Sequence, residues 1–299
     1  MSEKAFPKYK LEIQTSDGSI IIPSEEKGQL FNIEASVKYS CNESPNTCDV
    51  TIYNLNKASR DAIFHDSYDY FEFRKMTFMA GYGDDLQILF NGSIKEAYSD
   101  RQGPDVSTMI SGWDGFWYNN NLTTRSIDSG ADRNTAIKNI LRGVKNGEGY
   151  IKTIMSDFNN LPKNLRAETF SGRPQDLIKE RIGQDATLFY DDGKLFVLKD
   201  NDAIGKEGEI PLIDSNSGLI GVPVKRNKIV EFRMVFEPSL RIGRAFELKS
   251  SFSDKLNGIY KAIEITHDLS LGENIGGSNT TTVRAFSNND GFNYIGLGS

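Results

Sequence analysis

The sequence predicts a mainly β protein with a small α+β module near its middle. Over many short segments apolar residues alternate with polar ones, which is the period of a half-buried strand. The 299-residue chain also holds 27 Gly, which suits the tight turns between short strands. The helical period appears only in the middle of the chain. We therefore predict a β region at residues 1–118, an α+β module at 119–205 and a second β region at 206–299.

The first β region begins with a hairpin and continues as strands separated by turns. Leu11 and Ile13 alternate with polar residues, and Asp17-Gly18 predicts the turn that follows them. One short helix is expected after Asn56, which is a suitable N-cap. Asn91-Gly92 is interpreted as a turn between two strands. The further strands are expected at Phe31–Tyr39, Cys48–Leu55, Met76–Tyr82, Gln87–Phe90, Ser93–Tyr98 and Val106–Trp113.

The central module combines two helices with one hairpin. Apolar residues recur at helical spacing in Asp132–Arg142, with Asp128 or Ser129 as the expected N-cap and Gly143 at the end. A second helix is expected at Pro174–Ile182, where Pro174 suits the first turn. Asp191-Asp192-Gly193 between two apolar runs predicts a hairpin. Its strands are expected at Ala186–Tyr190 and Lys194–Leu198.

The second β region follows a polar, glycine-bearing joint at Gly205–Glu209. Its expected strands are Ile229–Phe236, Ala245–Ser250, Ile259–His267 and Thr281–Phe286. The two β regions share the order strand, Asn-Gly, strand, loop, strand, Asp-Gly, with Asn257-Gly258 matching Asn91-Gly92. This order is compatible with an internal duplication and also with two unrelated β regions that use ordinary turns.

The composition excludes several classes of protein. The net charge of -6 argues against a dedicated nucleic-acid binder. No apolar run approaches the ~18 residues of a spanning helix, and Met1–Lys10 contains no secretory apolar segment, so no membrane insertion is expected. Two Cys and two His are too few for a zinc cluster or a disulfide framework. We expect no metal and no cofactor.

The residues that could carry chemistry all have simpler structural interpretations. His65 and His267 are interpreted as surface or hydrogen-bonded residues rather than general bases. Cys41 and Cys48 are expected to be reduced thiols, although a transient disulfide between them stays open. The acidic pairs Asp84-Asp85 and Asp191-Asp192 stand beside Gly in predicted turns, so turn chemistry explains them. No catalytic, cofactor-binding or metal-binding residue is assigned.

Two further clusters have alternative interpretations. The aromatic run Trp113–Tyr118 is interpreted as rings that seal the end of a barrel, with stacking on a sugar as the alternative. The basic run Lys225-Arg226-Asn227-Lys228 is interpreted as a solvated loop, with a passing polyanion as the alternative.

Five sets of segments, taken in order over about residues 48–267, form a recognisable pattern. They are Val50–Leu55 with Ser59–Ile63, Met79–Gly83 with Leu89–Ile94, Asp191–Val197, Ile210–Ile213 with Gly218–Pro223, and Glu237–Gly243 with Asn257–Lys261. As an ordered set they resemble baseplate hub proteins of tailed phages, the late-control D-type hubs that join the tail tube to the central spike.

The resemblance implies an architecture and a set of partners. Such hubs carry two tube-like β-barrels that flank a smaller module, and three chains form a pseudo-six-fold ring. The expected protein is therefore a non-enzymatic homotrimer in the tail baseplate of a virion, or of a related contractile injection device, assembled in the host cytoplasm. Its expected partners are the tail tube protein, the central spike protein, other baseplate proteins and the tape measure protein. DNA would pass through the lumen without specific recognition.

Two alternatives stay open from the sequence. One is a tail tube or distal-tail protein of the same particle, with a different symmetry. The other is a carbohydrate-active β-enzyme that would use Trp113–Tyr118 and one of the carboxylates.

Overall fold

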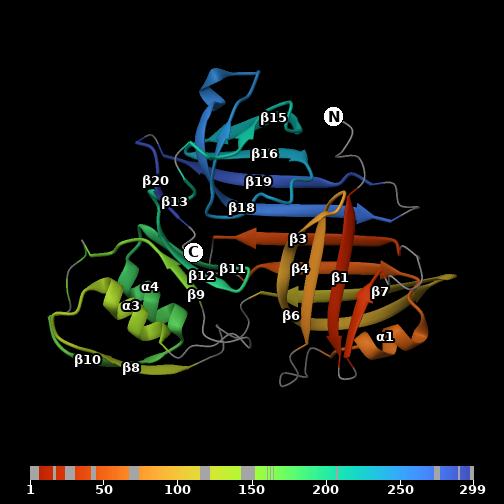
Figure 1. Cartoon of the computed structure of the whole chain (residues 1–299), viewed down its shortest axis with the longest axis horizontal. Helices are drawn as coiled ribbons and strands as arrows, with labels where there is room; N and C mark the ends of the chain where they lie inside the picture. The colour runs from red at the N-terminus through yellow and green to blue at the C-terminus, as the bar shows by residue number, and fades with distance from the viewer. Residues whose placement is uncertain are drawn as a thin grey trace.

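The computed structural model describes residues 7–15, 18–23, 31–41, 45–66, 74–114, 122–142, 152–159, 161, 163, 165–206, 208–272, 277–288 and 290–296. In these residues the protein is mainly β, and helices α3 and α4 lie together at one end of the molecule (Figure 1). The predicted fold class of a mainly β chain with an α+β insert is confirmed at this level.

The first β region contains one short helix and seven strands among the described residues. These are β1 (Lys8–Thr15), β2 (Gly18–Ile22), β3 (Ile33–Ser40), β4 (Thr47–Tyr53), α1 (Lys57–Ile63), β5 (Lys75–Tyr82), β6 (Asp85–Gln102) and β7 (Asp105–Trp113). The Asn56 side chain accepts the Ser59 N–H at 2.8 Å, which confirms the predicted N-cap of α1.

The predicted turn at Asn91-Gly92 is wrong, because both residues lie inside the single strand β6. The turn predicted beside Asp84-Asp85 is confirmed, because the chain reverses at Gly83, whose φ of 61° is the left-handed conformation that glycine favours. Gly92 has a packing role. A Cβ at this position would lie 2.6 Å from the Phe90 ring and would also collide with the Trp113 carbonyl of β7. The glycine therefore allows close approach of β6 and β7 rather than a turn.

The module combines two helices with a two-stranded sheet and a three-stranded sheet. Its elements are β8 (Thr123–Ile127), α3 (Arg133–Leu141), β9 (Lys152–Met155), β10 (Glu168–Gly172), α4 (Pro174–Ile182), β11 (Ala186–Asp191) and β12 (Lys194–Lys199). The N-cap of α3 is Asp132, which accepts the Thr135 N–H at 2.7 Å, so the predicted caps Asp128 and Ser129 are wrong. Gly143 lies outside the described residues.

Strand β12 is buried on both faces and joins the module to the rest of the protein. Leu195 and Val197 pack with the helices, whereas Phe196 and Leu198 belong to the main hydrophobic core. Phe196 stacks on Phe189 of β11 with ring centroids 5.0 Å apart. Because successive side chains of a strand point to opposite faces, one run of apolar residues serves two cores.

The second β region supplies the remaining strands. They are β13 (Asp202–Ile204), β14 (Leu212–Ile213), β15 (Leu219–Arg226), β16 (Ile229–Val235), β17 (Ala245–Leu248), a 3-10 turn η1 (Asp254–Leu256), β18 (Gly258–Leu271), β19 (Thr280–Ser287) and β20 (Asn293–Ile295). Asn257 ends η1 and Gly258 begins β18, so this Asn-Gly pair is not the counterpart of Asn91-Gly92 inside β6.

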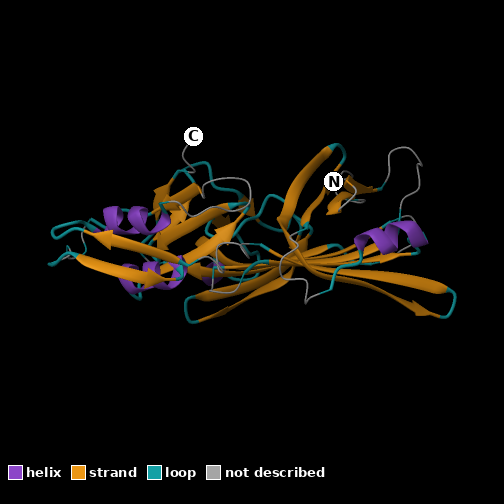
Figure 2. Ribbon diagram, turned by 90° about the horizontal axis from the view of Figure 1, so that it is seen from below, coloured by secondary structure: helices purple, strands orange, loops and turns teal. Residues whose placement is uncertain are grey.

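Both β regions belong to one 13-stranded sheet. Its order is β15-β16-β19-β18-β3-β4-β7-β6-β5-β1-β2, with β17 also paired to β18 and β14 to β17. The two regions meet where β3 pairs antiparallel with Glu264–Leu271 of β18. Figure 1 shows this joint, with blue β18 beside orange β3. Figure 2 shows the strands edge-on, with α1 at the opposite end from the module.

The strand order of the first region recurs in the second. In the first, β3, β4, β7, β6 and β5 are neighbours in that order, and in the second, β15, β16, β19, β18 and β17 are. All these pairs are antiparallel. Each repeat carries a bulge at the same pairing, after Ile94 in β6 and after Ala262 in β18. The shared bulge and order, rather than the Asn-Gly pairs, identify an internal repeat.

Candidate functional site

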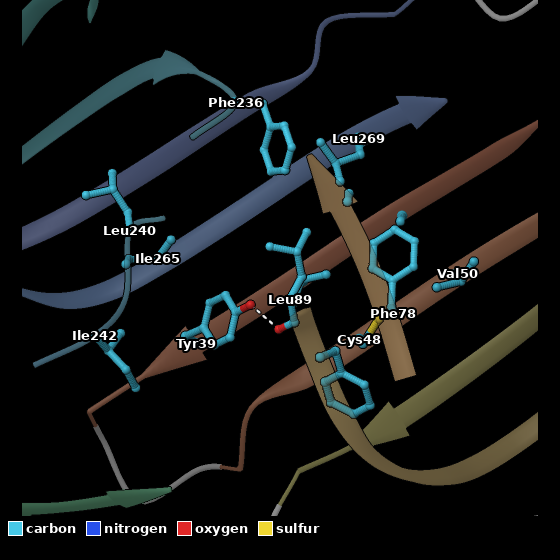
Figure 3. Packing of buried hydrophobic residues seen from close by; sticks show 14 of the residues in the cluster. Tyr39, Cys48, Val50, Phe78, Leu89, Phe236, Leu240, Ile242, Ile265 and Leu269 are labelled. Carbon is cyan, nitrogen blue, oxygen red and sulfur yellow. Dashed lines mark hydrogen bonds between the residues drawn. The ribbon is translucent and has the colours of Figure 1, made fainter. Parts of the chain in front are cut away.

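The most distinctive polar site is a buried cluster where all three predicted regions meet. We call it the junction cluster: Tyr39 of β3, Asn46 before β4, Asp114 after β7, Asp191 at the end of β11 and Arg241 between β16 and β17. All five side chains are buried or nearly so. Figure 3 shows Tyr39 directed at Leu89, with Leu240 and Ile242 on the segment that carries Arg241.

Arg241 is the centre of the junction cluster. Its Nη1 donates to the Tyr39 hydroxyl at 2.8 Å and lies 3.7 Å from Asp191 Oδ1. The Tyr39 hydroxyl in turn donates to the Leu89 carbonyl, and the guanidinium lies 5.2 Å from the Tyr39 ring. One cation therefore connects the module hairpin to strands of the first region.

Asn46 links the same regions through its amide. Its Nδ2 donates to the Tyr190 carbonyl of β11 at 2.6 Å, and its Oδ1 accepts the Ser40 N–H at 3.1 Å. Its backbone carbonyl accepts the Asp114 N–H at 3.0 Å. A buried amide satisfied in this way fixes the geometry of the joint, because leaving its groups unpaired costs free energy.

Burial dominates the electrostatics of the two carboxyl groups. It raises the pKa of Asp114 well above its usual value, and the nearby charges of Asp191 and Asp192 raise it further. Burial also raises the pKa of Asp191, although Arg241 opposes that shift. A raised carboxyl pKa is typical of a general acid, but structural networks produce it too. Asp114 is only 4% exposed, so this geometry favours a structural role.

The raised pKa of Asp114 predicts a pH dependence of stability. The folded state holds the Asp114 proton more tightly than the unfolded state, so the free energy of unfolding falls as pH rises from about 4 toward the raised pKa. We expect Asp114→Asn to remove this loss and to raise the thermal midpoint near pH 7 relative to the wild type. Thermal unfolding of the wild type and the variant between pH 4 and 8 measures this difference. If the thermal midpoints of the two proteins changed with pH in parallel, Asp114 would not be the cause of the loss.

His267 is a buried, neutral side chain rather than a base. His267 Nδ1 shares a hydrogen bond with Thr281 Oγ1 at 2.8 Å, and this hydroxyl oxygen also accepts the Glu237 N–H at 3.0 Å. The imidazole lies edge-on to the Tyr39 and Phe236 rings, with centroids 5.6 and 5.4 Å away. Burial, with a smaller contribution from Arg241, lowers its pKa to about 3.

This lowered pKa predicts a pH effect of opposite sign. The unfolded chain takes up a proton on His267 near pH 6.5, whereas the folded chain does not, so His267 makes the folded state less stable as pH falls from 6.5 toward 3. We expect His267→Phe to flatten the stability curve over this range while keeping an aromatic ring in place. Chemical unfolding at pH 4.5 and 7.5 tests this. An unchanged difference between the two pH values would show that His267 does not cause the loss.

His65 is buried beside β6. Its backbone exchanges two hydrogen bonds with Ala97 of β6, at 3.0 and 2.9 Å, and its side chain is 5% exposed. Cys41 and Cys48 are both free thiols and both buried. Burial raises the pKa of Cys41 to about 12 and that of Cys48 well above its usual value. Both thiols are therefore protonated and unreactive in the folded chain.

Lys261 is a buried cation that the sequence analysis missed. Its Nζ donates to the carbonyls of Lys199, Asp200 and Asp202 at 3.3, 2.7 and 3.1 Å. Burial lowers its pKa, and Cys41 together with the nearby aspartates opposes that shift. Because the ammonium group donates to these three carbonyl groups, Lys261 connects β18 to the end of the module.

The remaining sequence candidates are dispersed. Asp84 is exposed in its turn and pairs with Lys8 at 3.4 Å, whereas Asp191 belongs to the junction cluster. Of the aromatic run, Trp113 lies at the end of β7 with the Lys95 ammonium 4.9 Å from its ring, and residues 115–118 lie outside the described residues. The basic run is not a loop throughout, because Lys225 and Arg226 belong to β15 and only Asn227 and Lys228 form a turn.

Within the described ranges no group of three or more His, Cys, Asp or Glu side chains could hold a metal ion. No described helix has the length and apolar character needed to cross a membrane.

Comparisons with known proteins point to one class. A family model described as "Baseplate hub gp41" matches residues 13–274. The fold is similar to the 43 kDa tail protein of prophage MuSo2 from Shewanella oneidensis, at 8% identity over 93% of this chain and 96% of that chain, with a TM-score of 0.58. A tail protein from Neisseria meningitidis gives the same four values.

A third similar structure is the E. coli c3393 protein, at 9% identity over 90% of this chain and 78% of that chain, with a TM-score of 0.60. It is described as a component of the type VI secretion system with structural similarity to the T4 tail proteins gp27 and gp5. A search of curated proteins found no match.

Proposed function

The chain belongs to the baseplate hub gp41 family, and on this premise we propose that three copies form the hub ring between the tail tube and the central spike. The family makes the protein a structural component of a phage tail baseplate. The three-copy ring, the adaptor role and the channel are the proposal. Two tube-like barrels at residues 1–118 and 206–299, flanking the module at 119–205, are part of it.

The internal repeat is the observation that carries the proposal. Two five-stranded units with the same order and the same bulge occur in one chain. Three such chains contain six similar units, so one ring can present six-fold contacts to a tube and three-fold contacts to a spike. Closed symmetry of this kind resolves the mismatch between a six-fold tube and a three-fold spike, and every copy makes the same contacts.

The charge of the chain supports a channel that releases its contents. Binding to phosphates requires clustered Lys and Arg, whereas this chain has a net charge of -6. We propose that the tape measure protein and DNA pass through the lumen without specific recognition. The proposed partners are the tube, spike and other baseplate proteins, and the proposed place of assembly is the host cytoplasm.

The alternatives differ in symmetry and in chemistry. A tail tube or distal-tail protein would form a ring with another number of copies. A carbohydrate-active enzyme would need an accessible carboxyl group, whereas Asp114, beside Trp113, is buried. The junction cluster therefore does not supply the accessible carboxyl group that this alternative needs.

Two measurements test the proposed function. The mass of the purified full-length chain in solution and the symmetry of tail particles by electron microscopy should both give three copies. A six-copy ring in the particles would favour a tube role. A stable monomer that hydrolyses a surface polysaccharide, and loses this activity when one carboxylate is replaced, would overturn the hub.

A further inference from the structure

Two of the open strand edges of the sheet correspond, through the repeat, to two edges that pair inside the chain. Inside the chain, β3 of the first repeat pairs with the second half of β18, residues Glu264–Leu271, in the second repeat. The counterpart of β3 is β15, and the counterpart of the second half of β18 is the second half of β6. In the described part of the chain, no strand pairs with the outer edge of β15 or with residues Tyr98–Gln102 of β6 on the side away from β7.

The bulges fix which residues correspond. At the bulge, Gly112 of β7 and Ala285 of β19 hold equivalent places, and they face Cys48 and Val230. Cys48 faces Val37 on its other side, and Val230 faces Lys225. Lys225 of β15 is therefore the counterpart of Val37 of β3.

Counting residues from the same two bulges also identifies the equivalent residues of β6 and β18. Three residues beyond the first pair after each bulge, Ser99 faces Thr108 in the first repeat and His267 faces Thr281 in the second. Ser99 is therefore the counterpart of His267. Inside the chain Val37 faces His267.

We propose that β15 of one copy pairs antiparallel with Tyr98–Gln102 of β6 in a second copy, so that the sheet continues from chain to chain. Transfer of the inner register sets Lys225 opposite Ser99, Val224 opposite Asp100 and Arg226 opposite Tyr98. This inference rests on the proposed function, because it describes how copies of the hub would join.

The lengths of the two edges fit this register. Ala97 already exchanges both of its backbone hydrogen bonds with His65, so the open edge of β6 begins at Tyr98. Strand β15 ends at Arg226, and the chain reverses at Asn227, whose φ is 56°. The incoming strand therefore ends where the edge is already occupied. Because Ala97 directs both backbone groups to the open side, Ser99 and Arg101 direct theirs there too.

The side chains on the two edges are complementary. Ile220, Val222 and Val224 are exposed on β15, and Phe64 and Tyr98 are exposed beside β6. These two rings line a groove of about 410 Å³ between α1 and β6, together with Arg60, Asp61, Ser99, Asp100, Arg101 and Val106.

One cation on β15 can approach an acid of the groove. In the inferred register Arg226 lies on the same face as Asp100, which lines the groove with Asp61, Arg60 and Arg101. Arg101 is directed along its strand, where its Nε donates to the Gly103 carbonyl at 3.1 Å. The Lys225 and Lys228 ammonium groups lie 5.3 and 5.8 Å from the Tyr260 and Phe286 rings of their own chain.

The edge of β15 is also protected against indiscriminate pairing. Pro223 has no N–H to donate, and the pairing with β16 is irregular between Ile220 and Val224. Prolines, bulges and lysines are features that keep open edges from aggregating. They leave Val224–Arg226 as the regular part of the edge, and this is the part that the inferred register uses. The contact joins two different surfaces, so repeating it generates a closed ring or an open filament.

A disulfide between two copies tests the register. Val224 and Asp100 would form a non-hydrogen-bonded pair, with Cα atoms about 4.5 Å apart, a separation that a disulfide can span. Within one chain six strands lie between them. We expect the double variant Asp100→Cys/Val224→Cys to give covalent closed trimers under mild oxidation, both as purified full-length chain and in tail particles. The native thiols are buried and do not compete.

The matched control moves one cysteine to the next strand. Glu231 faces Val224 from β16, so Asp100→Cys/Glu231→Cys would leave the two Cα atoms more than about 7 Å apart, and no disulfide is expected. A mixture of the single variants Asp100→Cys and Val224→Cys should give covalent dimers only.

The outcomes separate this inference from the proposed function. Covalent chains longer than three copies would support the strand pairing and overturn the three-copy ring. A three-copy ring seen by microscopy, without cross-links from the double variant, would overturn the pairing and leave the hub role standing. Equal cross-linking of the control would also overturn the register.

Discussion

Replacing Arg241 with Met is expected to lower the free energy of unfolding by about 3–5 kcal/mol, the range for removing one partner of a buried ion pair. The variant loses the hydrogen bond to Tyr39 and leaves Asp191 buried without its ion-pair partner, with only the weaker influence of Arg244 and Lys194 remaining. Methionine keeps much of the side-chain volume, so the effect reports the charge and hydrogen bonds rather than a cavity.

Chemical unfolding followed by tryptophan fluorescence measures this loss. Arg284→Met is the matched control, because Arg284 also pairs with acidic residues, Glu264 and Glu231, but is 45% exposed. An exposed pair of this kind contributes about 0–1 kcal/mol. Equal effects of the two substitutions would show that the junction cluster holds no special share of the stability.

Replacing Gly243 with Ala is expected to lower the free energy of unfolding by about 2–5 kcal/mol. Its φ of 75° is left-handed, which costs a residue with a Cβ about 1–2 kcal/mol. The added Cβ would also lie 2.7 Å from the Phe189 ring and 3.1 Å from Ile204 Cδ1, and such overpacking costs about 1–3 kcal/mol. Since Phe189 belongs to β11, the substitution should weaken the packing between the module and the second β region.

Gly83→Ala separates the two causes. Gly83 has a similar φ of 61°, but a Cβ there meets nothing within 4 Å. The control variant should therefore show only the backbone cost of about 1–2 kcal/mol. If both variants lost the same free energy of unfolding, the residues around Gly243 would accommodate the added Cβ without an energetic cost.

Local patterns predicted the local structure well. The helix faces were correct, because Ile137 and Ile140 of α3 and Ile178 of α4 are buried as the helical period required. The hairpin β11-β12 and the cap at Asn56 were also correct, since both depend on residues close together in the chain. Strand β15 escaped prediction because Gly221 and Pro223 interrupt its alternation.

Long-range contacts could not be predicted in the same way. Tyr39 and Arg241 are 202 residues apart, and no spacing rule connects them. Gly92 was taken for a turn because its role depends on Trp113, a residue on another strand. The buried Asp114 and Lys261 carried no signal in the sequence, because their burial depends on segments far apart in the chain.

The pairing of β3 with β18 limits how this family of sequences can change in length. A strand that slips by one residue turns every side chain to the opposite face. Because β18 pairs with β17, β19 and β3, a single inserted or deleted residue in it would disturb both repeats together. Length changes should therefore accumulate at the reversals near Gly83 and Asn227, where added residues leave every register intact.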